Sequence, residues 1–286
     1  MTMNHFDVLA IEEASFGARV TGLKLAALTN EAFDALYQTW LKYALLIFPD
    51  QHLTREEQVS FARRFGRLES EMDLITNLDE HGKVRQDDDT DDTVKLLKGN
   101  LDWHCDSTYK TVQAKGAVFS ACVVPKQGGG TAFADMRAAY DALDAATKTL
   151  IAPLRAYHSI HYSQGRLGFE LKEGEYAAYG RSEVGEPLRP LVKVHPETGR
   201  KCLMIGRHAH AIPGMSEIDS EGLLQRLADF AIQPPRVYEH VWQPGDVVAW
   251  DNRALMHCAR PWDMREPRVM LNSRIAGDAA TESSIA

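Results

Sequence analysis

The sequence has few cysteines, no concentrated block of positive charge and no long hydrophobic run. Its four cysteines form no CxxC pair, which excludes a zinc ribbon and a disulfide-dense secreted scaffold and favours reduced thiols. The net charge is −8, so nucleic acid is not an expected partner. The longest apolar stretch, Ala44–Pro49, is far below the roughly 20 residues that span a bilayer, and the N-terminus has no signal pattern. We therefore expect a cytoplasmic protein that binds no membrane.

The composition is that of a globular protein. The chain has 286 residues, of which 44% are hydrophobic and 25% charged, so it can bury a substantial core and disorder over its whole length is excluded. No internal repeat and no linker-like segment interrupts it. We expect a single domain over residues 1–286.

The first part of the chain predicts two helices and a buried strand. Apolar residues recur over 33–41 with the period of a helix that packs on a core. The run Ala44–Pro49 follows and is typical of a buried strand. Thr54 and Glu57 then form a capping-box pattern that starts the second helix.

The rest of the chain predicts many short strands. Apolar periodicity also predicts helices over Ala138–Leu150 and Glu221–Phe230, whereas residues 69–98, with an acidic stretch at 87–92, indicate a long loop. Residues 281–286 are expected to be a frayed tail. Short strands separated by glycine, proline and asparagine favour a sandwich or barrel. The predicted strands are Ala117–Val124, Leu191–Val194, Cys202–Ile205, Val247–Trp250 and Val269–Ile275.

One short motif has the residue types of a metal site. His104 and Asp106 are two residues apart, and in a strand such residues share a face. A second histidine would complete a set of two imidazoles and one carboxylate, which leaves three coordination positions of Fe(II) open. His257 is the candidate, although a lone histidine is more often structural. These residues alone leave the third ligand open.

A series of landmarks along the chain resembles the taurine/2,4-dichlorophenoxyacetate dioxygenase family, whose members depend on Fe(II) and 2-oxoglutarate. The landmarks occur in the family's order: His104-x-Asp106, Gly129-Gly130-Thr131, Trp250-Asp251-Asn252-Arg253, His257 and Arg268. Three segments resemble more closely the aryloxyalkanoate dioxygenases that cleave phenoxypropionate herbicides, the S-selective type in particular. These segments are Phe133–Arg137, Val194–Arg200 and Gly206–Met215.

The resemblance implies an α+β fold with a double-stranded β-helix, or jelly roll, core and flanking helices. It implies that His104, Asp106 and His257 bind Fe(II). It also implies that Thr131 hydrogen-bonds 2-oxoglutarate and that Arg268 pairs with the distal carboxylate of that molecule. A guanidinium matches a carboxylate with two parallel hydrogen bonds and stays charged when buried. We expect Arg268 on the strand adjacent to that of His257.

The residues that bind the substrate are less clear from the sequence. Family members that cleave sulfonates or phenoxyacetates commonly carry a second arginine for the substrate anion, where this sequence has Asn272. We expect Arg207 to bind the substrate carboxylate. Arg274 is the second candidate because residues i and i+2 share a strand face, and for either arginine the alternative is an internal ion pair. Asn100 and Tyr162 are further candidates for substrate contact.

The predicted activity is hydroxylation of the carbon next to the ether oxygen of an aryloxyalkanoate, a small-molecule carboxylate. Fe(II) is the expected cofactor, and 2-oxoglutarate and O2 are the cosubstrates. The products are a phenol and an oxo acid, with succinate and CO2. The alternatives are a taurine or alkylsulfonate dioxygenase, which Asn272 disfavours, and a Zn²⁺-dependent hydrolase, in which Thr131 and Arg268 would have no purpose. Relatives of this kind are oligomeric, so we expect a homo-oligomer.

Overall fold

The computed structural model describes residues 6–87, 91–169 and 186–285. Its strands are β1 (Asp7–Ala10), β2 (Ala18–Thr21), β3 (Leu45–Phe48), β4 (Leu68–Thr76), β5 (Gly116–Val123), β6 (Thr131–Asp135), β7 (Arg155–His158), β8 (Leu188–Pro190), β9 (Val192–Val194), β10 (Lys201–Leu203), β11 (Ala209–His210), β12 (Val237–His240), β13 (Val247–Asp251), β14 (Leu255–Ala259) and β15 (Val269–Ile275). Its helices are α1 (Asn30–Tyr43), α2 (Arg55–Arg63), α3 (Asp92–Gly99), α4 (Met136–Ala142), α5 (Ala145–Ile151), α6 (Ile160–Gly165), α7 (Glu217–Ala231) and α8 (Ala279–Glu282), with a 3₁₀ turn, η1 (Leu25–Ala27).

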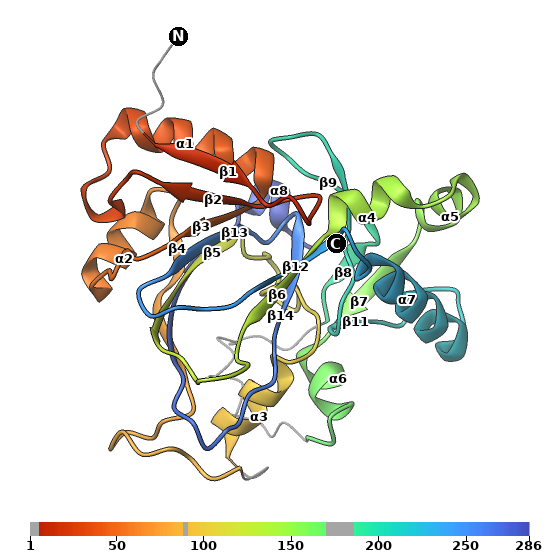
Figure 1. Cartoon of the computed structure of the whole chain (residues 1–286). Coiled ribbons are helices and arrows are strands. Elements are labelled where there is room, and N and C mark those ends of the chain that lie inside the picture. Colours follow the sequence, from red (N-terminus) through yellow and green to blue (C-terminus); the bar gives the residue numbers. More distant parts are fainter. Residues whose placement is uncertain (1–5, 88–90, 170–185, 286) are drawn as a thin grey trace.

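Two sheets form the centre of the molecule. The larger has the strand order β1-β2-β3-β13-β5-β15-β4, and the smaller has the order β12-β6-β14. Apart from the consecutive strands β1 to β3, strands adjacent in space come from distant parts of the chain, and nearly all pairs are antiparallel (Figure 1). This double-sheet arrangement with flanking helices is the predicted jelly roll. The α+β fold expected from the sequence is therefore confirmed.

The core lies in layers on both sides of the large sheet. Phe119 and Trp250 of that sheet and Phe133 of the small sheet belong to one buried cluster between the sheets. On the outer face, Leu36 of α1 and Phe61 of α2 pack in a second cluster. Full burial of such a side chain contributes about 1.5–3 kcal/mol. The apolar faces of the two helices thus cover the outer face of the large sheet.

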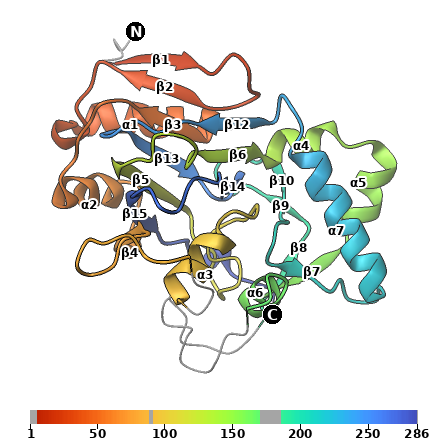
Figure 2. The same ribbon diagram turned by 60° about the horizontal axis from the view of Figure 1, so that its bottom comes forward.

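Three further helices lie on the opposite side of the molecule from α1 and α2. Figures 1 and 2 show α4, α5 and α7 together, away from α1 and α2. Leu223 and Leu227 of α7 pack with Met136 of α4 and Met256 of β14 in a third buried cluster. None of the helices in the described part of the chain is long and apolar enough to cross a membrane.

Several local predictions are confirmed. The capping box is complete, because the Glu57 N–H donates to Thr54 Oγ1 (3.2 Å) and the Thr54 N–H donates to Glu57 Oε2 (2.8 Å). The stripe at 33–41 lies in α1, and Ala44–Pro49 contains the fully buried β3. The run Val269–Ile275 is β15. In these segments the local sequence pattern is sufficient to predict the secondary structure.

The predicted long loop at 69–98 is wrong. It contains β4, at the edge of the large sheet, and α3, whose first turn is capped by the Asp91 carboxylate. An edge strand is partly exposed on both faces, so β4 lacks a regular apolar alternation. Residues 88–90 of the acidic stretch lie outside the described part of the chain.

The predicted helix over Ala138–Leu150 is two helices, because the Asp144 side chain accepts a hydrogen bond from Thr147 N and starts α5 anew.

The expected frayed tail is also wrong for its described residues. Glu282 is 1% exposed and forms an ion pair with Lys193. The backbone beyond it forms a bridge between Ser283 and Val112. Tertiary contacts that no local pattern encodes hold this segment.

We predict that Glu282→Ala destabilises the protein. Removing one partner of a buried ion pair leaves the Lys193 ammonium desolvated, which costs about 3–5 kcal/mol. Urea denaturation followed by circular dichroism would measure the loss in the free energy of unfolding. Glu12→Ala, at an exposed position, is the matched control. An unfolding free energy equal to that of the control would contradict the assignment.

Candidate active site

A cavity of about 620 Å³ opens between the two sheets. Its wall is built by β4, β5, β13 and β15 of the large sheet, β6 and β14 of the small sheet, and the helices α3 and α6. The residues predicted to bind metal, 2-oxoglutarate and substrate all line it, with the exception of Tyr162. The cavity is large enough for two small molecules side by side.

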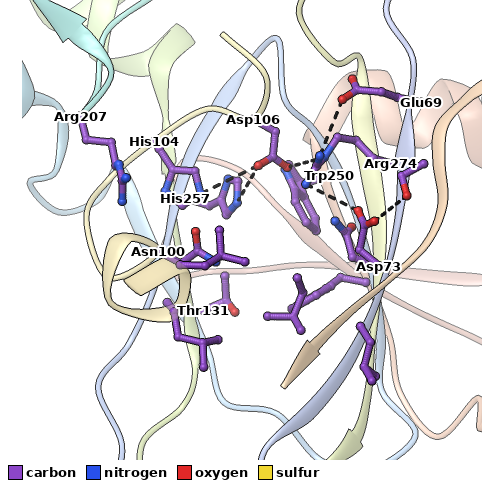
Figure 3. Close-up of a pocket in the computed structure, with 18 of the residues that line it drawn as sticks. Glu69, Asp73, Asn100, His104, Asp106, Thr131, Arg207, Trp250, His257 and Arg274 are labelled. Atoms are coloured by element: carbon purple, nitrogen blue, oxygen red, sulfur yellow. Dashed lines mark hydrogen bonds and ion pairs between the residues drawn. The ribbon is translucent and has the colours of Figure 1, made fainter. Parts of the chain in front are cut away.

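Three side chains converge in this cavity. Asp106 Oδ1 lies 3.9 Å from His104 Nε2 and 4.0 Å from His257 Nε2, and the two imidazole rings are 4.3 Å apart (Figure 3). One potential ligand atom from each residue lies within 4.8 Å of the others. Among the described residues this is the only group of three such side chains. Two imidazoles and a carboxylate on one side of an ion match the facial set of non-haem Fe(II) sites.

Backbone pairing brings the two histidines together. The His104 N–H donates to His257 O (2.9 Å), and the His257 N–H donates to His104 O (2.8 Å). Asp106 lies in a turn after this bridge rather than in a strand, so the strand argument that placed it beside His104 does not describe the geometry. Asn252 holds that turn: its Oδ1 accepts from Asp106 N (2.8 Å) and its Nδ2 donates to Asp106 O (2.9 Å).

Both histidines are in the neutral form that binds metal. Burial, and then the neighbouring His257, lowers the pKa of His104 to about 3. Burial also lowers the pKa of His257, although Asp106 opposes this. His104 Nδ1 lies 2.7 Å from Asp102 O, which fixes Nδ1 as the protonated nitrogen and leaves the Nε2 lone pair facing Asp106. The site is therefore prepared for a cation.

A buried cation lies in the same cavity. The Arg268 side chain is buried, its Nε donates to Gly129 O (3.0 Å), and its guanidinium lies 5.1 Å from the Trp262 ring. No carboxylate within the described ranges lies within 4.0 Å of it, and burial lowers its pKa to about 10. A buried charge of this kind calls for an anionic ligand.

The sequence had led us to expect Arg268 on the strand adjacent to that of His257, and this prediction is wrong. It directly precedes β15 in the large sheet, whereas His257 is on β14 in the small sheet. The connection between these strands crosses from one sheet to the other, and both residues line the same cavity.

Thr131 presents a hydrogen-bond donor to the cavity. Its Oγ1 accepts a hydrogen bond from Trp242 Nε1 (3.0 Å). An indole N–H can only donate, so the single hydroxyl proton of Thr131 must point elsewhere. Thr131 is buried and lines the cavity, which makes an acceptor on a bound molecule the natural partner. Trp242 is a residue that the sequence analysis missed, because nothing in its local pattern distinguishes it.

The two arginines considered for the substrate occupy different sides of the triad. Figure 3 shows Arg207 on the His104 side and Arg274 on the Asp106 side. The Arg207 guanidinium hydrogen-bonds Gly99 O and Gln164 Oε1 (2.8 Å). Arg274 faces carboxylates at 3.7–3.8 Å. The internal ion pair considered from the sequence therefore applies to Arg274.

The remaining substrate candidates have different surroundings. Asn100 ends α3 and lines the cavity. Asn272 lines the cavity as well, and its buried Oδ1 has no hydrogen-bond partner among the described residues. Tyr162 lies outside this cavity. Its ring stacks on His210 at 4.5 Å and its hydroxyl donates to Glu221 Oε1 (3.0 Å). The geometry gives the expected substrate contact of Tyr162 no support.

We predict that Arg268→Leu weakens the binding of 2-oxoglutarate, used here as a dicarboxylate probe. Charge-assisted hydrogen bonds contribute about 1.5–3 kcal/mol, which corresponds to roughly a 10- to 100-fold rise in Kd. Calorimetric titration of the Mn(II)-loaded protein would measure it. Arg265→Leu, three residues away on the surface, is the control. Equal affinities of the two variants would show that Arg268 does not meet the anion.

Comparison with known proteins agrees with this geometry. Residues 8–273 match the family described as taurine catabolism dioxygenase TauD, TfdA family. An (S)-phenoxypropionate/alpha-ketoglutarate-dioxygenase from Sphingobium herbicidovorans is 60% identical over 283 residues, which cover 98% of each chain. A protein of the same name from Delftia acidovorans is 54% identical over 278 residues, or 95% of each chain.

A solved structure has nearly the same fold. The crystal structure of AAD-2 in complex with Mn(II) and N-oxalylglycine matches with a TM-score of 0.90 and 38% identity, over 98% of this chain and 99% of that chain. The profile match and the two relatives each extend over nearly the whole sequence. The chain therefore belongs to the TauD, TfdA family of dioxygenases.

Proposed function

We propose that this protein is an Fe(II)- and 2-oxoglutarate-dependent dioxygenase that hydroxylates the carbon next to the ether oxygen of an (S)-2-aryloxypropionate. The observation that carries the proposal is the His104, Asp106 and His257 triad in one cavity with Arg268, a buried cation that has no carboxylate partner among the described residues. The 60% identical relative, named for (S)-phenoxypropionate, supports the substrate class.

His104, Asp106 and His257 would hold Fe(II). The donor set fits, because both imidazoles are neutral and the Asp106 carboxylate is ionised. When bound, the metal and 2-oxoglutarate supply the activation of O2, and 2-oxoglutarate leaves as succinate and CO2. The part of the protein is to hold the ligands, bind the cosubstrate and direct one C–H bond toward the metal.

Thr131 and Arg268 would bind 2-oxoglutarate. Arg268 would pair with the distal carboxylate through its planar guanidinium, and the Thr131 hydroxyl would donate one further hydrogen bond. The structural neighbour AAD-2 was crystallised with N-oxalylglycine, a dicarboxylate with the same separation between its acid groups. This likeness supports the assignment of that side of the cavity to the cosubstrate.

The substrate would lie on the other side of the triad. Leu96 and Leu97 of α3, Ile160 and Tyr109 line the cavity and give it apolar surface suited to an aryl ring. Arg207, on the His104 side, would meet the substrate carboxylate. Asn100 lines the same cavity and would add a polar contact.

Hydroxylation of the ether carbon determines the products. The hydroxylated carbon carries both a hydroxyl and an aryloxy group, so its C–O bond to the aryl oxygen breaks as the hydroxyl loses its proton. The aryl oxygen takes a proton and leaves as a phenol, and the remaining three carbons leave as pyruvate. No further residue is required for this collapse.

The two alternative activities fit the cavity less well. A sulfonate dioxygenase needs positive charge for its substrate, and the wall at Asn272 provides a neutral amide next to Asp73 in the neighbouring strand. A Zn²⁺-dependent hydrolase would leave the buried Arg268 without an anion to bind. Both alternatives are therefore disfavoured.

The cellular setting is also a proposal. The cysteines in the described structure are free thiols, which supports a reducing, cytoplasmic location. The family match over residues 8–273 supports a single dioxygenase domain. We propose a homo-oligomer by analogy with relatives of this kind, and light scattering would test its size.

We predict that the protein converts (S)-2-phenoxypropionate to phenol with an equal amount of succinate in the presence of Fe(II), 2-oxoglutarate and O2. Liquid chromatography would quantify both products. The R enantiomer and taurine serve as comparison substrates, and we expect slower phenol release and no sulfite, respectively. Sulfite release faster than phenol release would overturn the substrate class, and hydrolysis without succinate would overturn the dioxygenase itself.

We further predict that Trp242→Phe raises the KM for 2-oxoglutarate by up to about tenfold, with kcat nearly unchanged. The variant frees the Thr131 hydroxyl to reorient, and one hydrogen bond contributes about 0.5–1.5 kcal/mol. Steady-state kinetics at varied 2-oxoglutarate would measure the effect. Trp40→Phe is the control, because the buried Trp40 Nε1 has no partner in the described structure. A KM rise shared by both variants would point to packing instead.

A further inference from the structure

The two oxygens of the Asp106 carboxylate face different partners. Oδ1 faces both histidines, at 3.9 Å from His104 Nε2 and 4.0 Å from His257 Nε2. Oδ2 lies 3.8 Å from Arg274 Nε (Figure 3). A carboxylate that used both oxygens for a metal would occupy one more of the positions that a cosubstrate and O2 need. The arrangement separates a metal-facing oxygen from an arginine-facing one.

Arg274 is itself held from two sides. Its Nη1 lies 3.7 Å from Glu69 Oε1 and its Nη2 lies 3.8 Å from Asp73 Oδ2, both on β4. Figure 3 shows the guanidinium between these two carboxylates and Asp106. The Arg274 Nε atom is buried and makes no hydrogen bond within the described part of the chain. Its N–H is therefore available to the oxygen that it already faces.

The two acids on β4 are fixed in turn. Glu69 accepts hydrogen bonds from Ser107 Oγ (2.9 Å) and Lys110 Nζ (2.5 Å). Asp73 accepts one from Ser70 Oγ (2.6 Å). Since Ser107 directly follows Asp106, the same cluster also ties down the turn that carries the metal-facing carboxylate. Each group in the cluster thus has a fixed position relative to the triad.

A local irregularity of the sheet accompanies this arrangement. The pairing of β15 with β4 shifts register between Asn272 and Arg274, so β4 carries extra residues opposite this part of β15. Such bulges re-aim side chains and are common beside active sites. Here the irregularity lies opposite the stretch of β4 that provides Glu69 and Asp73. The edge strand that the sequence had indicated as a loop therefore has a defined part in the site.

The charge of this cluster argues against a substrate role for Arg274. One guanidinium faces the three carboxylates of Glu69, Asp73 and Asp106, and within the described ranges only Lys110 adds a second positive charge through an ion pair. A substrate carboxylate that approached Arg274 would meet these three acids within a few ångströms. Repulsion between like charges at such distances is substantial in a buried site. A divalent cation, by contrast, is attracted to the cluster.

We propose that Arg274 is a positioning residue that holds Asp106 Oδ2 through its Nε, so that Asp106 presents Oδ1 alone to the metal. Glu69 and Asp73 fix the guanidinium for this purpose. The proposal rests on the proposed function, because it takes the triad to be the metal site. It replaces the substrate role considered for Arg274 from the sequence.

The test is the metal affinity of Arg274 variants without substrate. Arg274→Gln removes the charge, and Arg274→Lys keeps the charge but removes the planar fork. Mn(II) would be titrated into each metal-free protein, and the free ion would be quantified by its electron paramagnetic resonance signal. Arg265→Gln, on the surface, is the matched control. Circular dichroism would verify the folding of each variant.

We expect the Mn(II) Kd of Arg274→Gln to rise by about 10- to 100-fold, as for other groups that orient metal ligands, and that of Arg274→Lys to rise at least about threefold. The KM for (S)-2-phenoxypropionate at saturating Fe(II) should change little. If Arg274→Gln does not fold, the Mn(II) Kd of Arg274→Lys, compared with that of the control, decides instead.

An unchanged Mn(II) Kd together with a raised substrate KM would overturn the proposal and make Arg274 a substrate-binding residue. An unchanged Kd with an unchanged KM would overturn it as well. If the wild-type protein binds no Mn(II), the metal site itself is wrong, and the proposed function fails with it. The wild-type titration therefore separates the two failures.

Discussion

The site depends on one backbone interaction, the antiparallel bridge between His104 and His257. Two hydrogen bonds join these residues, so their side chains leave the paired backbones in neighbouring positions and the rings lie 4.3 Å apart. The bridge connects the segment before β5 with β14, parts of the chain separated by the whole middle of the sequence. Once it forms, the Asn252 side chain and the hydrogen bond from Ser107 to Glu69 hold the turn that brings the Asp106 carboxylate to the same point.

Charge compensation then divides the cavity into two regions. Arg274 is surrounded by carboxylates, and Asp106 is one of them. Burial alone would raise the pKa of Asp106, but nearby positive charge, that of Arg274 above all, outweighs it and the pKa lies below its ordinary value. Arg268 has no such carboxylate among the described residues. The same residue type is therefore charge-compensated by carboxylates at one position and left without a carboxylate partner in the described structure at the other.

Sequence patterns predicted the elements whose signal is local. The capping box at Thr54 and Glu57 and the fully buried strand β3 depend on residues a few positions apart, and both are present. The edge strand β4 and the segment around Glu282 were missed because their order comes from pairing with β15 and from contacts with Lys193. Neither segment has a periodic hydrophobic pattern of its own that would predict its structure.

The sequence by itself determined the chemical types that could form the site: two histidines, an aspartate, a threonine and several arginines, in the order typical of the family. Only the tertiary structure decided which arginine keeps its charge available. Arg268 and Arg274 are six positions apart on one segment, and only the family resemblance, not composition or periodicity, assigned them different roles. The difference arises because β4 brings Glu69 and Asp73 to Arg274, whereas Trp262 and a backbone carbonyl surround Arg268. The charge that an arginine offers to a ligand depends on neighbours that only folding assembles.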